Sequence, residues 1–414
     1  MKEKLLHTPD GVRDIYGREY ENKLCIQDRL HHELKLYGYQ DIQSPTFEYF
    51  EIFSNKIGTI PSKELYKFFD KEGNTLVLRP DITPSIARAT AKYFKDEKKP
   101  LRFCYMGNTF INAGELQGRL KETTQIGAEL IGDASVEADA EIISLVVSSM
   151  KAAGLQDFQI SIGNVEFFKG LCSEYGIDDE AEMMLRDYIS NKNYFGTMDI
   201  LDSLNLPAEA KDAILKISEL FGSVETIHLA KELVSNERSI HAIERLEQLY
   251  ELLHVYEAEQ YVTFDLGMLS KYHYYTGMIF RAYTYGSGDA VIKGGRYDAL
   301  LNEFGKHSAA VGFAVTVDQL LSALSRQSIM IERQNPQELL IYPKEHSKTA
   351  IRYAEKLRKS GIGIELLPIT EDLSAKDYLE QASNNYIHAA IVIRDEHHAV
   401  SHDVCNGQSK EINI

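Results

Sequence analysis

Apolar residues recur at helical spacing near the start of the chain and at strand spacing in many later segments. Ile26, Leu30 and Leu34 lie four residues apart, which predicts a helix over residues 21–37 that ends at Gly38. The other elements expected in this region are a strand at 39–50, a hairpin at 63–80, a helix at 83–94, strands at 101–111 and 122–132, and a helix at 136–153. The pattern predicts a sheet covered by helices.

The hydrophobic pattern of the chain changes after the last of these helices. Residues 171–258 carry long helical patterns rich in Leu, Glu and Ala, which predict a helical insertion. Strand patterns return over 261–320, and beyond a polar linker at 326–337 strands alternate with helices over residues 338–414. We therefore expect an α+β core over residues 1–325, built on an antiparallel sheet flanked by helices, and a small C-terminal α/β domain.

Length and composition fit a folded protein of two or three domains. The chain has 414 residues, and 44% of them are hydrophobic, which is ample for a buried core. No apolar run approaches the roughly 18 residues that span a bilayer, and the N-terminal segment lacks the apolar stretch of a secretion signal, so we expect a cytoplasmic protein. The net charge of −17 argues against nucleic acid as the main ligand.

Cysteine and histidine spacing predicts no metal site. The four cysteines are Cys25, Cys104, Cys172 and Cys405. Their separations match no metal-binding spacing and are typical of reduced thiols. Several metal-ligand residue types gather at 397–405, but their spacing fits no closed tetrahedral set, which favours a solvated turn there.

Polar residues at a strand end and inside an apolar strand are candidates for a binding site. Asp81 and Thr83 lie where a strand gives way to a helix, so they either cap that helix or hold an ammonium group, and the residue types alone favour the cap. Gln125 and Glu129 are four residues apart in a strand and share a face. A carboxylate among apolar neighbours is costly unless it meets a cation or donor; the alternative is an edge strand whose polar groups lie in water.

Two further strings combine aromatic residues or glycines with strand patterns. Tyr274 and Tyr275 precede an apolar strand. Because adjacent strand residues point to opposite faces, at most one of the two tyrosines lines a given pocket. The ordinary role of either tyrosine is packing in the sheet. The string at 293–298 contains two glycines. Glycines in a strand allow a ligand or another backbone to approach, although a bulge or bend is their commoner meaning.

Taken together, these strings resemble the histidyl-tRNA synthetase family. Similar segments occur in the family's order: LRPDITPSIAR, GRLKETTQIGAELIG, YYTGMIF, GGRYDALLNEFG and AAVGFAVTVDQLL. Ahead of them, GYQDIQSPTFEYFE is similar to the first signature of class II aminoacyl-tRNA synthetases, the helix and strand that build their dimer. The resemblance covers about residues 7–325 and implies the class II synthetase fold.

The resemblance also implies a histidine pocket. In that family, histidine is enclosed by the positions that match Asp81, Thr83, Gln125, Glu129, Tyr274 and Tyr275. Histidine suits these residue types, because carboxylates accept hydrogen bonds from an ammonium group and a carboxylate and a tyrosine can satisfy the imidazole nitrogens.

The departures from the synthetase pattern fall on residues that bind ATP. Three positions where the family carries arginine are Ile111, Ser270 and Gln319 in this chain. Such arginines stabilise the charge that develops at the α-phosphate of ATP, and losing one contact of this kind costs about 10²–10³ in rate. We expect a pocket that keeps its amino-acid end and has no catalytic residues, although Arg119 remains and leaves residual anion binding open.

A pocket of this kind resembles that of the regulatory subunits of ATP phosphoribosyltransferase. The resemblance implies a non-catalytic chain without a cofactor. It implies a short-form catalytic subunit as partner, activation of the first step of histidine biosynthesis, and feedback by L-histidine as ligand. It also implies a self-dimer through the first-signature helix and strand, and a C-terminal domain at 338–414 similar to a shortened anticodon-binding domain.

Two other functions remain as alternatives on the same scaffold. A divergent histidyl-tRNA synthetase would activate histidine with ATP, which the three lost arginines disfavour. A tRNA-sensing module would need a basic C-terminal domain, but residues 336–414 carry 9 Lys or Arg and 12 Asp or Glu. We therefore expect neither tRNA nor a membrane as a partner.

Overall fold

The computed structural model describes residues 6–54, 60–112, 120–204, 206–269, 274–331, 338–384, 387, 389–404 and 406–414. The chain divides into two compact units: the first contains Lys23–Met330 with Met1–Tyr16, and the second contains Ile331–Ile414 with Gly17–Asn22. The linker expected at 326–337 lies partly outside the described residues.

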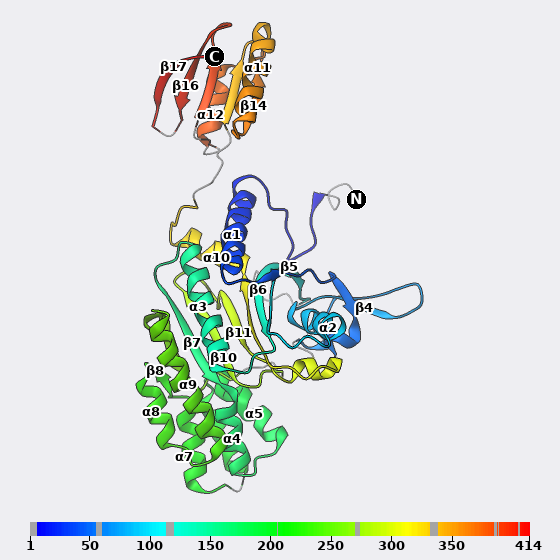
Figure 1. Cartoon of the computed structure of the whole chain (residues 1–414), viewed down its shortest axis with the longest axis vertical. Coiled ribbons are helices and arrows are strands. Elements are labelled where there is room, and N and C mark those ends of the chain that lie inside the picture. The colour runs from blue at the N-terminus through cyan, green and yellow to red at the C-terminus, as the bar shows by residue number, and fades with distance from the viewer. Residues whose placement is uncertain are drawn as a thin grey trace. The chain divides into compact units, whose positions relative to one another are not determined.

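Among the described residues, nine strands form the central sheet of the first unit (Figure 1). Their order is β1-β5-β6-β12-β11-β10-β7-β9-β8. The strands are β1 Gln40–Asp41, β5 Leu101–Phe110, β6 Glu122–Ile131, β7 Phe158–Asn164, β8 Phe221–Gly222, β9 Val262–Asp265, β10 Met278–Thr284, β11 Ile292–Arg296 and β12 Ala310–Thr316. The predicted antiparallel sheet is confirmed from β5 to β7, whereas β1 pairs with β5 and β9 with β7 in parallel. The hydrophobic pattern predicted no strand at the position of β7.

The helices of the first unit form two groups. The core helices are α1 Gly17–Leu36, of which the residues from Lys23 onward belong to this unit, α2 Thr83–Tyr93, α3 Val136–Ala152 and α10 Val317–Arg326. The predicted insertion is confirmed as α4 Val165–Glu174, α5 Asp179–Ser190, α6 Tyr194–Ser203, α7 Ala208–Ile217, α8 Glu225–Glu232 and α9 Glu237–Val255. It begins earlier than expected, because α4 follows β7 directly. None of the helices in the described ranges is long and apolar enough to cross a membrane.

The two faces of the central sheet are covered by different elements. Helix α3 contacts β12, and α10 contacts β6 and β12. A separate cluster joins α2 and the 3₁₀ helix η5 Leu300–Phe304 to Phe103 and Tyr105 of β5. Glu129 of β6 is paired directly with Phe103, and directly paired residues of neighbouring strands share a face. Glu129 therefore lies on the face that α2 covers.

Between β1 and β5 in the sequence, three short strands form a separate small sheet of order β2-β4-β3. The predicted hairpin is confirmed as β3 Lys67–Phe69 and β4 Thr75–Leu78, which pair antiparallel. The single strand expected at 39–50 is instead two strands, β1 and β2 Phe47–Tyr49, with Pro45 between them. Proline has no N–H group for a ladder, which explains the interruption.

In its described residues, the second unit contains a five-stranded sheet of order β14-β13-β15-β16-β17 and two α-helices. Its elements are β13 Glu338–Tyr342, α11 Ser347–Lys359, β14 Ile364–Pro368, α12 Ala375–Asn384, β15 Ala389–Ile393, β16 His398–Asp403 and β17 Gln408–Asn413. The parallel pairs β13–β14 and β13–β15 confirm the predicted alternation. The turn predicted at 397–405 was wrong for β16, which pairs antiparallel with β15 and β17; Cys405 lies outside the described residues.

Candidate functional site

A buried carboxylate lies on the sheet face that α2 covers. Glu129 is 1% exposed and lies on β6, between β5 and β12, so the edge-strand alternative was wrong. Its Oε1 accepts a hydrogen bond from Oγ1 of Thr83 at 2.7 Å, and its Oε2 accepts one from the hydroxyl of Tyr297 at 2.5 Å. Burial raises the pKa of Glu129 to about 8, although both hydroxyl donors act to lower it. The carboxyl group is therefore poised to change its protonation near neutral pH.

Two glycines make room for Glu129 and for a tyrosine ring. Gly312 of β12 pairs with Glu129, and Gly295 of β11 pairs with Gly312. A Cβ atom on Gly312 would lie 1.7 Å from Oε2 of Glu129, and one on Gly295 would lie 2.7 Å from Cε1 of Tyr275. The glycine at 295 therefore permits close approach of a ring within a regular ladder, so the bulge alternative was wrong.

Asp81 and Thr83 lie at the start of α2, as predicted, but their side chains have different partners. Asp81 Oδ1 accepts a hydrogen bond from the Thr83 N–H at 3.2 Å, so this carboxylate satisfies a donor of the first helical turn. The Thr83 hydroxyl instead donates to Glu129. Burial raises the pKa of Asp81. One oxygen of Asp81 thus contacts the first turn of α2, whereas the Thr83 hydroxyl belongs to the Glu129 cluster.

Tyr274 and Tyr275 precede β10 rather than forming part of it. Because β10 begins at Met278, strand alternation does not separate their side chains. Their ring centroids are 4.6 Å apart, and the Tyr274 ring is 5.9 Å from that of Tyr297. Both tyrosines pack with the cluster that contains Tyr297. Their packing agrees with the ordinary role expected of sheet aromatics, and their place in a binding site stays a prediction.

Two buried polar atoms on this face have no hydrogen-bond partner among the described residues: the Tyr105 hydroxyl and Oε1 of Gln125. Tyr105 is 4% exposed and lies over Gly127, two residues before Glu129, because a Cβ there would be 2.3 Å from its hydroxyl. Gln125 shares the face of Glu129 by its even separation on β6. Buried polar atoms are normally paired, so Oε1 of Gln125 offers a ligand a hydrogen-bond acceptor, whereas the Tyr105 hydroxyl lies close enough to Glu129 to lower the pKa of that carboxyl.

Sequence reasoning missed Tyr105 and Tyr297 as members of this cluster. Tyr297 lies two residues after the glycine pair of β11, and that string drew attention only for its glycines. Its position beyond a glycine pair was the one signal that could have identified it. Tyr105 alternates with Phe103 along β5 like any core aromatic residue, and nothing in its sequence context distinguishes it.

The positions at which the synthetase family carries arginine hold other side chains. Ile111 follows β5, and its N–H donates to the Lys121 carbonyl at 2.9 Å. Gln319 lies on α10 beside Asp318, whose carboxylate accepts a hydrogen bond from Lys23 Nζ at 2.9 Å. Ser270 and Arg119 both lie outside the described residues, so the anion contact expected of Arg119 stays a prediction.

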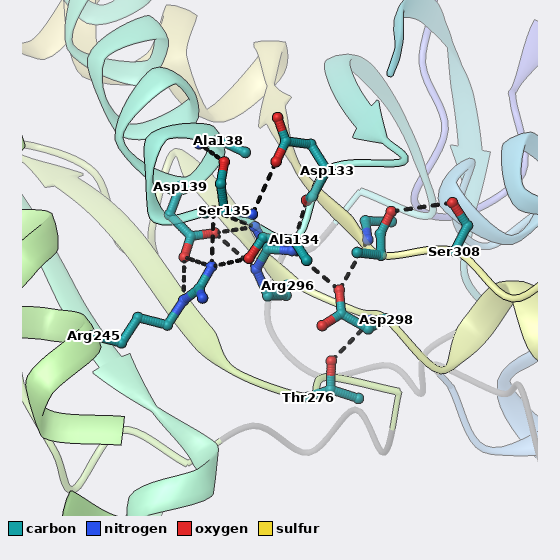
Figure 2. Close-up of polar contacts among 12 residues, drawn as sticks. Asp133, Ala134, Ser135, Ala138, Asp139, Arg245, Thr276, Arg296, Asp298 and Ser308 are labelled. Carbon is teal, nitrogen blue, oxygen red and sulfur yellow. Dashed lines mark hydrogen bonds and ion pairs between the residues drawn. The ribbon is translucent and has the colours of Figure 1, made fainter. Parts of the chain in front are cut away.

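A buried ion-pair network anchors the end of β11 (Figure 2). Arg296, which is 3% exposed, donates to Oδ1 of Asp139 on α3 from Nε at 2.9 Å and from Nη2 at 2.6 Å. The other carboxylate oxygen of Asp139 accepts a hydrogen bond from Nε of Arg245 on α9 at 2.7 Å. Arg296 also binds Asp298, whose N–H donates to Oγ1 of Thr276 at 2.8 Å. The network joins the core, the insertion and the segment that follows the tyrosine pair.

Comparison with known proteins first gives the class. The family model for histidyl-tRNA synthetase matches residues 11–320. A histidyl-tRNA synthetase structure from Nostoc sp. has a TM-score of 0.82 over 99% of this chain and 97% of that chain; at 20% sequence identity this likeness shows the fold alone. The chain thus has the histidyl-tRNA synthetase fold, a class II synthetase fold, as the sequence strings predicted.

More similar relatives give the family within that class. An ATP phosphoribosyltransferase regulatory subunit from Acetivibrio thermocellus is 37% identical over 100% of this chain and 99% of its own length, and one from Ruminiclostridium cellulolyticum is 39% identical over 98% and 96%. A crystal structure from Bacillus halodurans, described as an ATP phosphoribosyltransferase regulatory subunit/histidyl-tRNA synthetase, is 34% identical with a TM-score of 0.82, covering 92% and 96%. This chain belongs to the family of ATP phosphoribosyltransferase regulatory subunits.

The buried network gives a first prediction. Replacing Asp139 by Asn leaves the Arg296 guanidinium buried without its main counter-charge, and we expect the free energy of unfolding to fall by about 3–5 kcal/mol in urea titrations. Arg245→Gln is the matched control, because Asp139 then still pairs with Arg296 and the loss should be smaller. Equal losses in the two variants would contradict the assignment of Arg296 as the main partner.

The glycine beneath the carboxylate gives a second prediction. Gly312→Ala forces Glu129 or the backbone of Ala128 to move, since the new Cβ would also lie 2.6 Å from the Ala128 carbonyl oxygen. We expect a loss of about 1–3 kcal/mol in the free energy of unfolding, as is usual for overpacking. Gly288→Ala is the control, because a Cβ at that position meets nothing within 4 Å. A Gly312→Ala protein as stable as the control would show that Glu129 does not need this space.

Proposed function

We propose that this chain is a non-catalytic, histidine-sensing regulatory subunit of ATP phosphoribosyltransferase. The phosphoribosyl transfer, the first step of histidine biosynthesis, then takes place in a short-form catalytic subunit that the chain activates. The observation that carries the proposal is the buried Glu129 with hydroxyl donors around it and unpaired polar atoms of Tyr105 and Gln125 beside it. Such a constellation is incomplete without a polar ligand.

L-Histidine fits this constellation by its chemistry. Its ammonium group needs acceptors, which Asp81 and the amide oxygen of Gln125 supply. Its imidazole ring offers an N–H donor to Glu129 and an acceptor nitrogen to a tyrosine hydroxyl. Together with Thr83, Tyr274 and Tyr275, these residues form the proposed histidine site, in agreement with the resemblance that first suggested them.

The missing arginines support a regulatory role rather than amino-acid activation. A class II synthetase stabilises a pentavalent phosphate with guanidinium groups, and Ile111 and Gln319 supply no charge at two of those positions. Asp318, next to Gln319, carries a negative charge and is paired with Lys23, so this part of α10 serves a structural ion pair. A divergent histidyl-tRNA synthetase remains the second candidate, tested below.

Feedback follows from linkage between two conformations. If histidine binds one state of the regulatory subunit more tightly, it shifts the complex toward that state in proportion to the difference in affinity. A coupling of about 1–3 kcal/mol is sufficient for useful inhibition. No chemistry at the histidine site is needed, which agrees with a pocket that keeps only its amino-acid end.

The assembly around this site is part of the proposal. We propose a self-dimer through α1 and the following strand, because Leu24 and Leu36 are large exposed apolar residues on α1. The unit at 338–414 serves packing or assembly rather than tRNA binding, in keeping with its net negative charge. A cytoplasmic location agrees with a role in biosynthesis.

Histidine binding gives a third prediction. Glu129 has a pKa of about 8 without ligand, so at pH 7 it is mostly protonated, and a donor from histidine should lower that pKa and expel the proton. Calorimetric titration of histidine in buffers of different ionisation heat should show proton release at pH 7, and affinity should rise with pH up to about 8. Glu129→Gln should bind histidine about 10–100-fold more weakly and release no proton.

The matched control for this experiment lies on the same strand. Glu122→Gln removes a carboxylate that accepts a hydrogen bond from Asn108 and lies on the opposite face of β6. We expect this variant to bind histidine like the wild type. Tight histidine binding by Glu129→Gln, with unchanged proton release, would exclude Glu129 from the site.

Reconstitution gives a fourth prediction, which tests the function itself. Adding the chain to a short-form ATP phosphoribosyltransferase catalytic subunit should raise the rate of phosphoribosyl transfer, and histidine should then inhibit the complex. The half-maximal inhibitory histidine concentration should rise in Glu129→Gln by the same factor as the dissociation constant, because one site serves both. Glu122→Gln should be inhibited like the wild type.

The second candidate predicts a different result. A divergent synthetase would catalyse histidine-dependent exchange of pyrophosphate into ATP, and its histidine affinity would depend on ATP. We expect neither. Pyrophosphate exchange above background would favour the synthetase function over the regulatory one. Phosphoribosyl transfer that the added chain does not stimulate would count against the regulatory function.

A further inference from the structure

Three side chains of metal-ligand type converge away from the histidine site, at the edge of the central sheet. His31 lies on α1, Asp41 on β1 and Cys104 on β5. His31 Nε2 is 2.5 Å from Asp41 Oδ1, and the Cys104 sulfur is 3.4 Å from the same oxygen. One ligand atom from each residue falls within 4.8 Å of the other two. Three separate elements therefore present an imidazole, a carboxylate and a thiol to one point.

We propose that His31, Asp41 and Cys104 bind a borderline-soft divalent cation of the Zn²⁺ class, with water in the fourth position. Imidazole, thiolate and carboxylate are the ligands that Zn²⁺ takes in proteins, at about 2.0–2.3 Å each, so neighbouring ligand atoms in a tetrahedral site lie about 3.3–3.7 Å apart. The sulfur-to-oxygen distance already falls in this range. The His31–Asp41 distance must open by about 1 Å, which side chains 40% and 62% exposed allow.

Binding has a definite charge and proton balance. The thiol of Cys104 loses its proton to solvent as the sulfur–metal bond forms, and the Lys35 ammonium leaves Asp41, to which it is bound at 2.9 Å. Neutral imidazole, carboxylate and thiolate then neutralise the cation. The groups that face the thiol are Asp41 on β1 and His31 and Lys35 on α1.

The chemical class of the cation follows from the ligand types. Mg²⁺ and Ca²⁺ prefer oxygen ligands and would gain little from an imidazole and a thiol, whereas Zn²⁺ and Co²⁺ suit this mixed set. Sequence spacing gave no sign of this site, because 10 residues separate His31 from Asp41 and 63 separate Asp41 from Cys104. Only the parallel pairing of β1 with β5, which places Asp41 opposite Cys104, brings the ligands together.

Titration of the full chain with Co²⁺ tests the proposal directly. We expect one Co²⁺ per chain, the visible absorption of a tetrahedral site and a thiolate-to-cobalt charge-transfer absorption in the near ultraviolet, with Zn²⁺ displacing the Co²⁺. His31→Ala should weaken binding at least about tenfold, and Cys104→Ser should abolish the charge-transfer absorption while the protein remains folded. Because His31 lies near the surface, its variant tests the site even if Cys104→Ser fails to fold.

His32→Ala is the matched control, since this exposed histidine is the next residue on α1 and lies outside the cluster. It should bind Co²⁺ like the wild type. The proposal is overturned if the wild type gives no saturable charge-transfer absorption, or if His32→Ala weakens binding as much as His31→Ala. None of these outcomes depends on histidine binding or on a catalytic partner, so the test is independent of the proposed function.

Discussion

The fold around the proposed histidine site depends on burying one carboxyl group in an otherwise apolar sheet face. Glu129 is held there by hydroxyl groups of Thr83 and Tyr297 and has space only because residue 312 has no side chain. An isolated ionised carboxylate in such a place would cost several kcal/mol. The raised pKa of Glu129 shows that the hydrogen bonds offset this cost only in part. The proposed histidine ligand would complete the compensation by donating a further hydrogen bond.

This incomplete compensation suits a sensor better than an enzyme. A catalyst needs groups that bind the transition state more tightly than the substrate, and the arginines that would do so at the ATP end are replaced at Ile111 and Gln319. A sensor needs only a ligand whose binding changes the stability of one conformation. In the proposed function the amino-acid end alone fulfils that requirement, and loss of the ATP end would separate the two functions on one scaffold.

The Arg296–Asp139–Arg245 network connects this region with the rest of the first unit. It binds the end of β11 to α3 and to α9 of the helical insertion, and its Asp298 branch reaches Thr276, the residue after Tyr275. A fully paired buried network makes the elements that it joins rigid with respect to one another.

The sequence by itself determined the periodic elements and the residue types of the proposed histidine site. Helical spacing in α1 and the alternation of the C-terminal strands and helices follow from local patterns, and Asp81, Thr83, Gln125 and Glu129 were identified from ordered motifs. Tertiary structure decided what those residues meet. Pairing β6 with β5 and β12 buried Glu129, the late start of β10 brought both tyrosines together, and strand register placed Tyr105 and Tyr297 nearby. Contacts between strands distant in sequence leave no periodic trace, because each strand's pattern records which face is buried and not which neighbour covers it.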